Sequence, residues 1–347
     1  MTGTALPQDA PPDGPLRTAY AAARRILPGL AVSGLVAMSA VLVTEHHGGP
    51  VMLMALLMGM AVGFLRENER LAPGLRFGAS SVLRTGVALL GARITAQYLS
   101  DLGWIALGAV AVGVALTLAV GIVLARALGR SGWFGALAGG AVAICGASAA
   151  AAISAVLPRQ QRNEADTAMT IIGVTALSTV AMVLYPVIGK AHDLGDRDIG
   201  FFIGLTIHDV AQVVGAGYSV SDEAGTIAVV VKLFRVVLLL PVVLVIALAA
   251  RSASEGGTSM RAGLPGFVIA FAILAGAGSA GLIPPAASLW LSDLSRWCLI
   301  LAMGAIGIRT SLKELQQLGY RPAVVLIGST VFIGACGLLA TALLAGR

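Results

Sequence analysis

The chain has 347 residues, of which 57% are apolar and only 12% are charged, and its formal net charge is +6. Soluble domains carry about 25% charged residues, so this composition excludes both a soluble globular protein and a disordered one. The basic residues are spread thinly along the chain, so the positive charge does not indicate binding to nucleic acid. The three cysteines lie in apolar stretches and are odd in number, which argues against a disulfide framework.

The predicted organisation is a short tail followed by one membrane domain. We expect residues 1–25, which begin with a proline-rich segment, to form a disordered cytoplasmic tail, and residues 26–347 to form a transmembrane domain. The expected fold is an all-α polytopic membrane protein with about eleven transmembrane helices, including discontinuous ones. The eleven apolar stretches cover 26–43, 49–65, 78–92, 104–125, 132–157, 168–189, 199–217, 226–250, 265–283, 292–308 and 323–345.

The basic residues of the loops predict an orientation. With the N-terminus in the cytoplasm, 15 of the 23 Lys and Arg residues fall in cytoplasmic segments and 4 fall outside, as the positive-inside rule requires. The weakest point is the loop 158–166, which would place Arg159 and Arg162 outside. If 132–157 is instead a re-entrant hairpin, this loop returns to the inside and the count of spans changes.

An internal repeat is apparent in two short motifs. Gly91-Ala92-Arg93 and Gly307-Ile308-Arg309 are 216 residues apart, and the leucines and glycines after them keep the same spacing. In the predicted topology the two motifs end spans on opposite sides of the membrane. Inverted repeats of this kind are typical of secondary transporters. The alternative is two similar helix ends in a glycine-rich protein.

Polar side chains cluster near the middle of the predicted span 199–217. His208 and Asp209 lie there beside Thr206 and Gln212, and ionisable groups inside a bilayer are functional candidates. Because histidine titrates near neutral pH, we expect His208 and Asp209 to carry a proton and Thr206 and Gln212 to line a substrate path. The alternative is a structural polar cluster between helices.

Two further cations lie in the predicted span 226–250. Lys232 and Arg235 are three residues apart, so they share one face of a helix. Two cations on one face repel each other unless an anionic group joins them, and we expect that group to be Asp209 or a substrate anion. The alternative is that both side chains reach towards the membrane interface.

The segment Cys145-Gly146-Ala147-Ser148 lies in a run of small residues. Gly146 can interrupt the helix, and Ser148 can cap the helix that follows. The N-terminus of a half-helix inside the membrane would offer free N–H groups and a positive potential to an anion. The alternative is that the small residues serve close helix packing.

The remaining features indicate neither an enzyme nor a cofactor. No P-loop, zinc motif, dinucleotide-binding fingerprint or nucleophile elbow occurs in a suitable context. Arg84 and Arg296 lie in the early turns of their spans, so we expect both to be interface anchors. Glycine-rich stretches at 59–63 and 139–140 can pack helices within a protomer or between the protomers of a homo-oligomer.

The two long motifs, 140–149 and 206–217, resemble signatures of the YeiH family of bacterial inner-membrane proteins, and the shorter runs 87–91, 232–235 and 304–307 also fit. The resemblance runs from about residue 26 to the end, with Ala147 where family members often have Gly. Members of this family carry the name of sulfate exporters. The resemblance implies a secondary transporter related to cation/proton antiporters and bile-acid symporters, in which two discontinuous helices cross near the bilayer centre.

That relationship leaves a difficulty in the predicted topology. In those relatives the crossing helices are repeat partners, but the span that holds Cys145 has no partner seven spans later in the chain. Either the span count is wrong in one half, or the paired break lies elsewhere, for instance at Gly304–Gly307.

The expected function is secondary active transport of a small anion of the sulfate, sulfite or organic sulfonate class, coupled to protons, in the bacterial inner membrane. One alternative is a cation/proton antiporter with Asp209 as its cation-exchanging carboxylate. Another is a non-transporting membrane sensor or scaffold, which the lack of an appended soluble domain disfavours. We expect His208 and Asp209 to couple the proton. The residues expected to contact the anion are Cys145, Gly146, Ala147, Ser148, Thr206, Gln212, Lys232 and Arg235.

Overall fold

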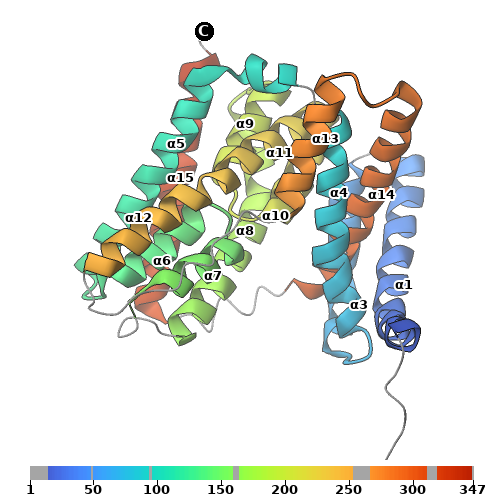
Figure 1. Ribbon diagram of the computed structural model, residues 1–347, viewed down its shortest axis with the longest axis horizontal. Coiled ribbons are helices and arrows are strands. Elements are labelled where there is room, and N and C mark those ends of the chain that lie inside the picture. Colours follow the sequence, from blue (N-terminus) through green and yellow to red (C-terminus); the bar gives the residue numbers. More distant parts are fainter. Residues whose placement is uncertain are drawn as a thin grey trace, which may run out of the picture.

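The computed structural model describes residues 15–47, 50–93, 96–158, 164–252, 266–310 and 319–345, and every regular element in these ranges is helical (Figure 1). Three short turns, η1 (Gly63–Glu67), η2 (Gly78–Val82) and η3 (Gly91–Arg93), connect the early helices. The helices are α1 (Pro15–His47), α2 (Val51–Ala61), α3 (Ala72–Phe77), α4 (Leu83–Leu90), α5 (Ala96–Ala127), α6 (Gly132–Ala143), α7 (Ala147–Val156), α8 (Glu164–Ala191), α9 (Asp196–Thr206), α10 (Val210–Tyr218), α11 (Asp222–Val237), α12 (Leu239–Ser252), α13 (Gly266–Ser279), α14 (Pro285–Arg309) and α15 (Tyr320–Ala345).

Within the described residues, six helices are long and apolar enough to cross a membrane, and α11 and α12 together make up one of them. They are Ala23–His47, Leu102–Ala127, Glu164–Ala191, Asp222–Ala250, Ala286–Arg309 and Tyr320–Leu344. Large apolar side chains on their outer faces, among them Leu35, Trp104 and Leu339, are exposed, as expected of a surface that contacts lipid. The all-helical, polytopic membrane protein predicted from the sequence is therefore confirmed. Eleven separate spans are not.

The first departure from the predicted spans is a re-entrant hairpin formed by α6 and α7. A Cβ atom on Gly140 of α6 would collide with Ile153 of α7. The two helices therefore pack against each other, and the chain reverses direction at the break between them. Beyond the hairpin, Arg130 before α6 and Asp166 in α8 form an ion pair of 2.6 Å. Both ends of the segment thus lie at the same end of the molecule. A single span over 132–157 was wrong, and the hairpin alternative holds.

The helices α9 and α10 form a second hairpin, which enters from the opposite end (Figure 1). Gly200 and Gly204 of α9 pack in turn against the start and the middle of α11, so α9 runs beside α11 in the same direction. At the end of α10, Gly217 packs against Gly225 near the start of α11. The chain therefore returns to the end at which α9 began. The predicted continuous span over 199–217 was wrong for this reason.

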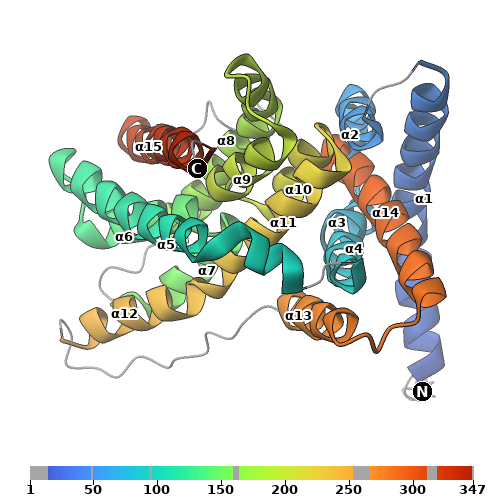
Figure 2. The same ribbon diagram turned by 90° about the horizontal axis from the view of Figure 1, so that it is seen from above.

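The helices form two groups that face each other (Figure 2). The first group holds α1 to α4 with α13 and α14, and the second holds both hairpins with α5, α8, α11, α12 and α15. Helix α10 lies between the groups and contacts α2 and α14 of the first. Within the first group, Gly59 and Gly307 let α2 and α14 approach so closely that a Cβ on either would collide with the other helix.

Three further expectations can be compared with the structure. Helix α1 begins at Pro15, so residues 15–25 are helical where a disordered tail was expected, and residues 1–14 lie outside the described residues. Gly304–Gly307 lie within the continuous helix α14, so the paired break is not there. The two repeat motifs end α4 and α14 at opposite ends of the molecule (Figure 1). The continuation of the second motif, over 311–318, lies outside the described residues.

Candidate functional site

The tip of the first hairpin is built around Gly146. Its φ of 63° and ψ of −123° belong to a region that residues with a Cβ rarely adopt, which is why glycine ends α6 and allows α7 to begin at Ala147. Gly146 is also the N-cap residue of α7, and no side chain caps this helix. The predicted break at Cys145–Ser148 is confirmed. The predicted capping by Ser148 is wrong, because Ser148 lies inside the first turn of α7.

The tip of the second hairpin is formed by residues 207–209. Asp209 is the N-cap residue of α10, and its carboxylate accepts a hydrogen bond from the N–H of Ala211 at 3.1 Å. The N–H of Asp209 donates to the hydroxyl of Ser178 in α8 at 3.1 Å. A Cβ on Gly146 would lie 3.9 Å from the Cβ of Asp209, so the two tips meet. Because the chain is extended at Ile207 and Asp209, these residues do not lie within a continuous helix, as the predicted span 199–217 required.

Lys232 of α11 holds both tips from behind. Its side chain is fully buried. The Nζ atom donates to the carbonyl oxygen of Ile144 at 2.5 Å, to that of Ile207 at 2.9 Å, and to that of His208. These carbonyl groups lie at the ends of α6 and α9, where helices leave carbonyl groups without an intrahelical partner. One ammonium group therefore satisfies the open ends of both half-helices.

Arg235 lies one turn further along α11, is also fully buried, and donates hydrogen bonds to carbonyl groups of both hairpins. Its guanidinium donates to Ala143 at 2.9 Å, to Gly204 at 3.0 Å and to Ile207 at 2.9 Å, and also to the carbonyl of Val142. The sequence predicted an anionic partner for these two cations. The structure shows backbone carbonyl groups as their hydrogen-bond partners, whose partial negative charge accumulates at helix C-termini, and the anionic partner stays a prediction.

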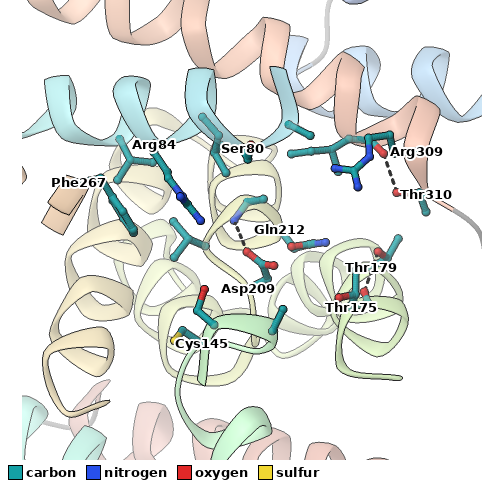
Figure 3. A pocket seen from close by; sticks show the side chains of 18 of the residues that line it. Ser80, Arg84, Cys145, Thr175, Thr179, Asp209, Gln212, Phe267, Arg309 and Thr310 are labelled. Atoms are coloured by element: carbon teal, nitrogen blue, oxygen red, sulfur yellow. Dashed lines mark hydrogen bonds between the residues drawn. The ribbon is translucent and has the colours of Figure 1, made fainter. Parts of the chain in front are cut away.

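A cavity of about 350 Å³ lies against the tips where α7 and α10 begin (Figure 3). The threonines Thr175 and Thr179 of α8 add polar groups to its wall. The first group of helices supplies the opposite wall. Of the residues proposed from the sequence, those that line the cavity are Cys145, Ala147, Ser148, Asp209 and Gln212.

The other proposed residues lie behind this cavity. The hydroxyl of Thr206 donates to the carbonyl of Phe202 at 2.6 Å, and its side chain is buried within the second group of helices. The Nε2 atom of His208 lies 2.9 Å from the hydroxyl oxygen of Thr330 on α15. Thr206 and His208 are not among the described residues that line the cavity. The same holds for Gly146, Lys232 and Arg235. The structure therefore separates His208 from Asp209, although the two are adjacent in the chain.

Two arginines that sequence reasoning did not select also line the cavity. Arg84 follows η2 and reaches in beside Phe267, whose ring centre lies 6.0 Å from the guanidinium carbon. Arg309 enters from the end of α14 (Figure 3). The sequence did contain two signals. Arg84 lay inside an apolar span without a partner, and Arg309 was the shared arginine of the repeated motif.

Gln212 is deeply buried in the cavity wall, with 3% of its surface exposed, the same fraction as Thr179. Its Oε1 atom is buried and has no hydrogen-bond partner within the described part of the chain. Buried amide groups in native proteins are almost always hydrogen-bonded. This oxygen therefore marks a place where a water molecule or a polar ligand completes the wall.

Comparisons with known proteins find relatives that are named as membrane proteins. A family model described as Conserved hypothetical protein 698 matches residues 28–326. The chain is 51% identical over 311 residues to the UPF0324 membrane protein TauZ of Paracoccus denitrificans, a match that covers 88% of this chain and 92% of that protein. It is 47% identical over 312 residues to a UPF0324 membrane protein of Chlorobaculum tepidum, covering 89% of this chain and 87% of that one.

No solved structure matches the chain. The family match nonetheless establishes which family the chain belongs to. The matched region, residues 28–326, contains every helix of both hairpins and both arginines of the cavity. The resemblance drawn from the two long motifs is confirmed by it. The chain belongs to the UPF0324 family of membrane proteins, which is the YeiH family.

Proposed function

We propose that this protein is a secondary transporter of a small anion, bound in the cavity between the two hairpin tips. A single observation carries the proposal. The N-termini of α7 and α10, together with Arg84 and Arg309, face one cavity at the meeting point of two half-helices. Helix N-termini present unpaired N–H groups and a positive potential, and guanidinium groups bind oxyanions with paired hydrogen bonds.

The buried cations of α11 make this site more positive than the tips alone. A half-helix has a negative end as well as a positive one, and a nearby negative end would cancel part of the attraction for an anion. Lys232 and Arg235 take up the carbonyl ends of α6 and α9 through their hydrogen bonds. Under this proposal they support the anion site from behind, without touching the anion.

Asp209 is the residue that we propose to couple transport to protons. It is the one carboxylate among the described residues that line the cavity, and it caps α10 at the tip. A proton on this carboxylate removes a negative charge from an otherwise positive site. Anion binding and proton binding therefore favour each other there. His208 is a second candidate for proton coupling. A change in its charge would act first on Thr330, its hydrogen-bond neighbour.

We further infer that the two halves of the molecule are related by inversion. The hairpins enter from opposite ends and each is followed by a long helix, α8 or α11. The repeated motifs also end α4 and α14 at opposite ends. Secondary transporters use such repeats to alternate access to a central site. The positive-inside bias supports an N-terminus in the cytoplasm, and the family resemblance supports the bacterial inner membrane and the sulfate, sulfite or sulfonate class.

The rival function is cation/proton antiport with Asp209 as the exchanging carboxylate. It is favoured by the presence of Asp209 in the cavity wall. It is disfavoured by Arg84, Arg309 and the two helix N-termini, which all raise the energy of a cation in the same space.

The proposal is tested with purified protein in proteoliposomes. Under an imposed proton gradient, we measure uptake of radiolabelled sulfate, with unlabelled sulfite and methanesulfonate as competitors. Arg84→Gln and Arg309→Gln should each raise the KM of the transported anion about tenfold, the value of one charged hydrogen bond of ~1.5 kcal/mol. Arg70→Gln removes the same charge from an exposed position outside the cavity and should change KM less than twofold.

Two results would reject anion transport. One is the absence of flux for all three anions with protein that remains folded and monodisperse. The other is a current evoked by Na⁺, but by none of the anions, that disappears in Asp209→Asn. The second result would establish the cation antiporter in its place.

A further inference from the structure

A second cavity, of about 330 Å³, adjoins the central one at the end of the molecule where α1 begins. We call it the arginine vestibule. It is lined by Arg66, Glu67, Ala72, Leu75, Arg76 and Arg309. Half of these residues are arginines, and they come from η1, from the last turn of α3 and from the end of α14. Nothing in the central site accounts for Arg66 and Arg76.

The vestibule and the central cavity lie on either side of Arg309 and its neighbour. Arg309 lines both spaces. The guanidinium of Arg66 donates to the carbonyl oxygen of Thr310 at 3.4 Å, and Thr310 also lines the central cavity. An ion that passes from the vestibule inwards therefore meets Arg66 or Arg76 first, then Arg309, and then the hairpin tips.

The net charge of the vestibule is positive. The one carboxylate among its described lining residues, Glu67, lies 3.9 Å from Arg66 and is 80% exposed, so water screens most of this attraction. A cavity of about 530 Å³ at the opposite end of the molecule differs. The cations Lys190 and Arg296 that line it are matched there by Asp222 and Asp293. Of these two cavities, as lined by the described residues, the vestibule is therefore the one with an excess of positive charge.

We propose that the arginine vestibule is an entry site for small anions, which it concentrates and passes to Arg309. A concave site lined by one sign of charge focuses its field and raises the local concentration of counter-ions. The proposal rests on the proposed function for the identity of the transported ion. It makes a separate claim about access, namely that an anion reaches the central cavity through this entrance faster than an equivalent cation.

Access can be measured without transport. Ser148 is exposed in the wall of the central cavity, so Ser148→Cys, with Cys145, Cys298 and Cys336 replaced by alanine, places one thiol there. The probes are two methanethiosulfonate reagents of similar size, one ending in a sulfonate and the other in a trimethylammonium group. The measured quantity is the ratio of their rates of reaction with purified protein in phosphatidylcholine nanodiscs.

We expect the ratio to favour the anionic reagent and to fall about fivefold for each of Arg66→Gln and Arg76→Gln, because removing one charge several ångströms from the path changes the two rates in opposite directions. At about 1 M salt, where the Debye length is about 3 Å, the differences between variants should disappear. Arg70→Gln is the matched control. It removes an exposed arginine from the same connection between α2 and α3 that does not line the vestibule, and the ratio should be unchanged.

Three outcomes would overturn the vestibule. A ratio that Arg66→Gln and Arg76→Gln leave unchanged, in protein with normal thermal stability, shows that the reagents enter elsewhere. An equal fall with Arg70→Gln shows a general surface effect. Phosphatidylglycerol added to the nanodiscs could also lower the rate ratio of the wild type to that of the variants. This result would show that lipid headgroups bind the arginines. Failure of sulfate flux alone would reject the proposed transport and leave these ratios to decide the vestibule.

Discussion

Lys232 and Arg235 donate to the same acceptor, the carbonyl oxygen of Ile207, each at 2.9 Å. Both also donate to the first hairpin, Lys232 to Ile144 and Arg235 to Ala143. One helix, α11, therefore fixes the position of both tips at once. The half-helices need this support because their last carbonyl groups end inside the protein, where water cannot satisfy them.

The first prediction concerns this support. We expect Arg235→Met to lower the free energy of unfolding by about 3–5 kcal/mol, because carbonyl groups of both half-helices, those of Ala143 and Gly204, lose this donor and each unsatisfied buried group costs about 1–3 kcal/mol. Thermal unfolding in detergent micelles measures the loss. Lys190→Met, which removes an exposed cation from the last turn of α8, should leave the midpoint unchanged. Equal stability of Arg235→Met and wild type would show that water or other donors replace the guanidinium.

The second prediction separates the capping role of Asp209 from its charge. Asparagine caps helices as well as aspartate does, so Asp209→Asn should keep the stability of the wild type, whereas Asp209→Ala should lose about 1 kcal/mol. Ser131→Ala, which removes the cap of α6 far from the cavity, gives the matched loss for a cap alone.

Transport should respond differently to the same Asp209 variants. A carboxylate that takes up a proton strengthens anion binding as the pH falls, so wild-type KM should rise with pH. Asp209→Asn should show a KM that is low and independent of pH. A pH dependence that persists in Asp209→Asn would assign the coupling to another group, with His208→Gln as the next variant to measure.

The third prediction concerns the backbone of Gly146. A Cβ there would find ordinary van der Waals distances, the nearest atom being 3.7 Å away in Val174, so space does not oppose a side chain. The backbone angles do, and we expect Gly146→Ala to cost about 1–3 kcal/mol of stability. Gly108→Ala on α5, where nothing lies within 4 Å, should be neutral or slightly stabilising. Equal effects of the two changes would show that the tip can relax.

The fourth prediction tests the sign of the charge that the cavity accepts. Gln212→Glu keeps the shape of the side chain and adds a carboxylate next to Asp209. For an anion site this should raise KM at least tenfold, while a cation site would bind more tightly. Asn68→Asp makes the same chemical change at an exposed residue outside the cavity and should leave KM unaltered. Steady-state uptake in proteoliposomes gives both values.

Much of the fold could be predicted because the relevant signals are local. Apolar stretches of sufficient length located the long helices, and a glycine in a run of small residues located the break at Gly146. The break at 207–209 was missed because the sequence there contains neither glycine nor proline. It exists because Lys232 and Arg235, more than twenty residues later, supply hydrogen bonds that compensate the lost helical ones.

The candidate site was predicted in part for a similar reason. The sequence identified the residues at the tips, since their chemistry is unusual for a membrane interior. It could not reveal whether a buried cation meets a side chain or a backbone carbonyl, because carbonyl groups occur at every residue. Arg84 and Arg309 were read as anchoring and loop residues, and only the packing of α4 and α14 against the hairpins turns them inwards.

The cavity has one wall in each of the two groups of helices. The tips with Asp209 and Gln212 belong to the second group, and Arg84 and Arg309 belong to the first. An anion held by both walls acts as a bridge between two bodies that otherwise meet mainly along α10. Under the proposed function, its binding energy is linked to the separation of the groups, so we expect loading the site to draw them together and emptying it to release them.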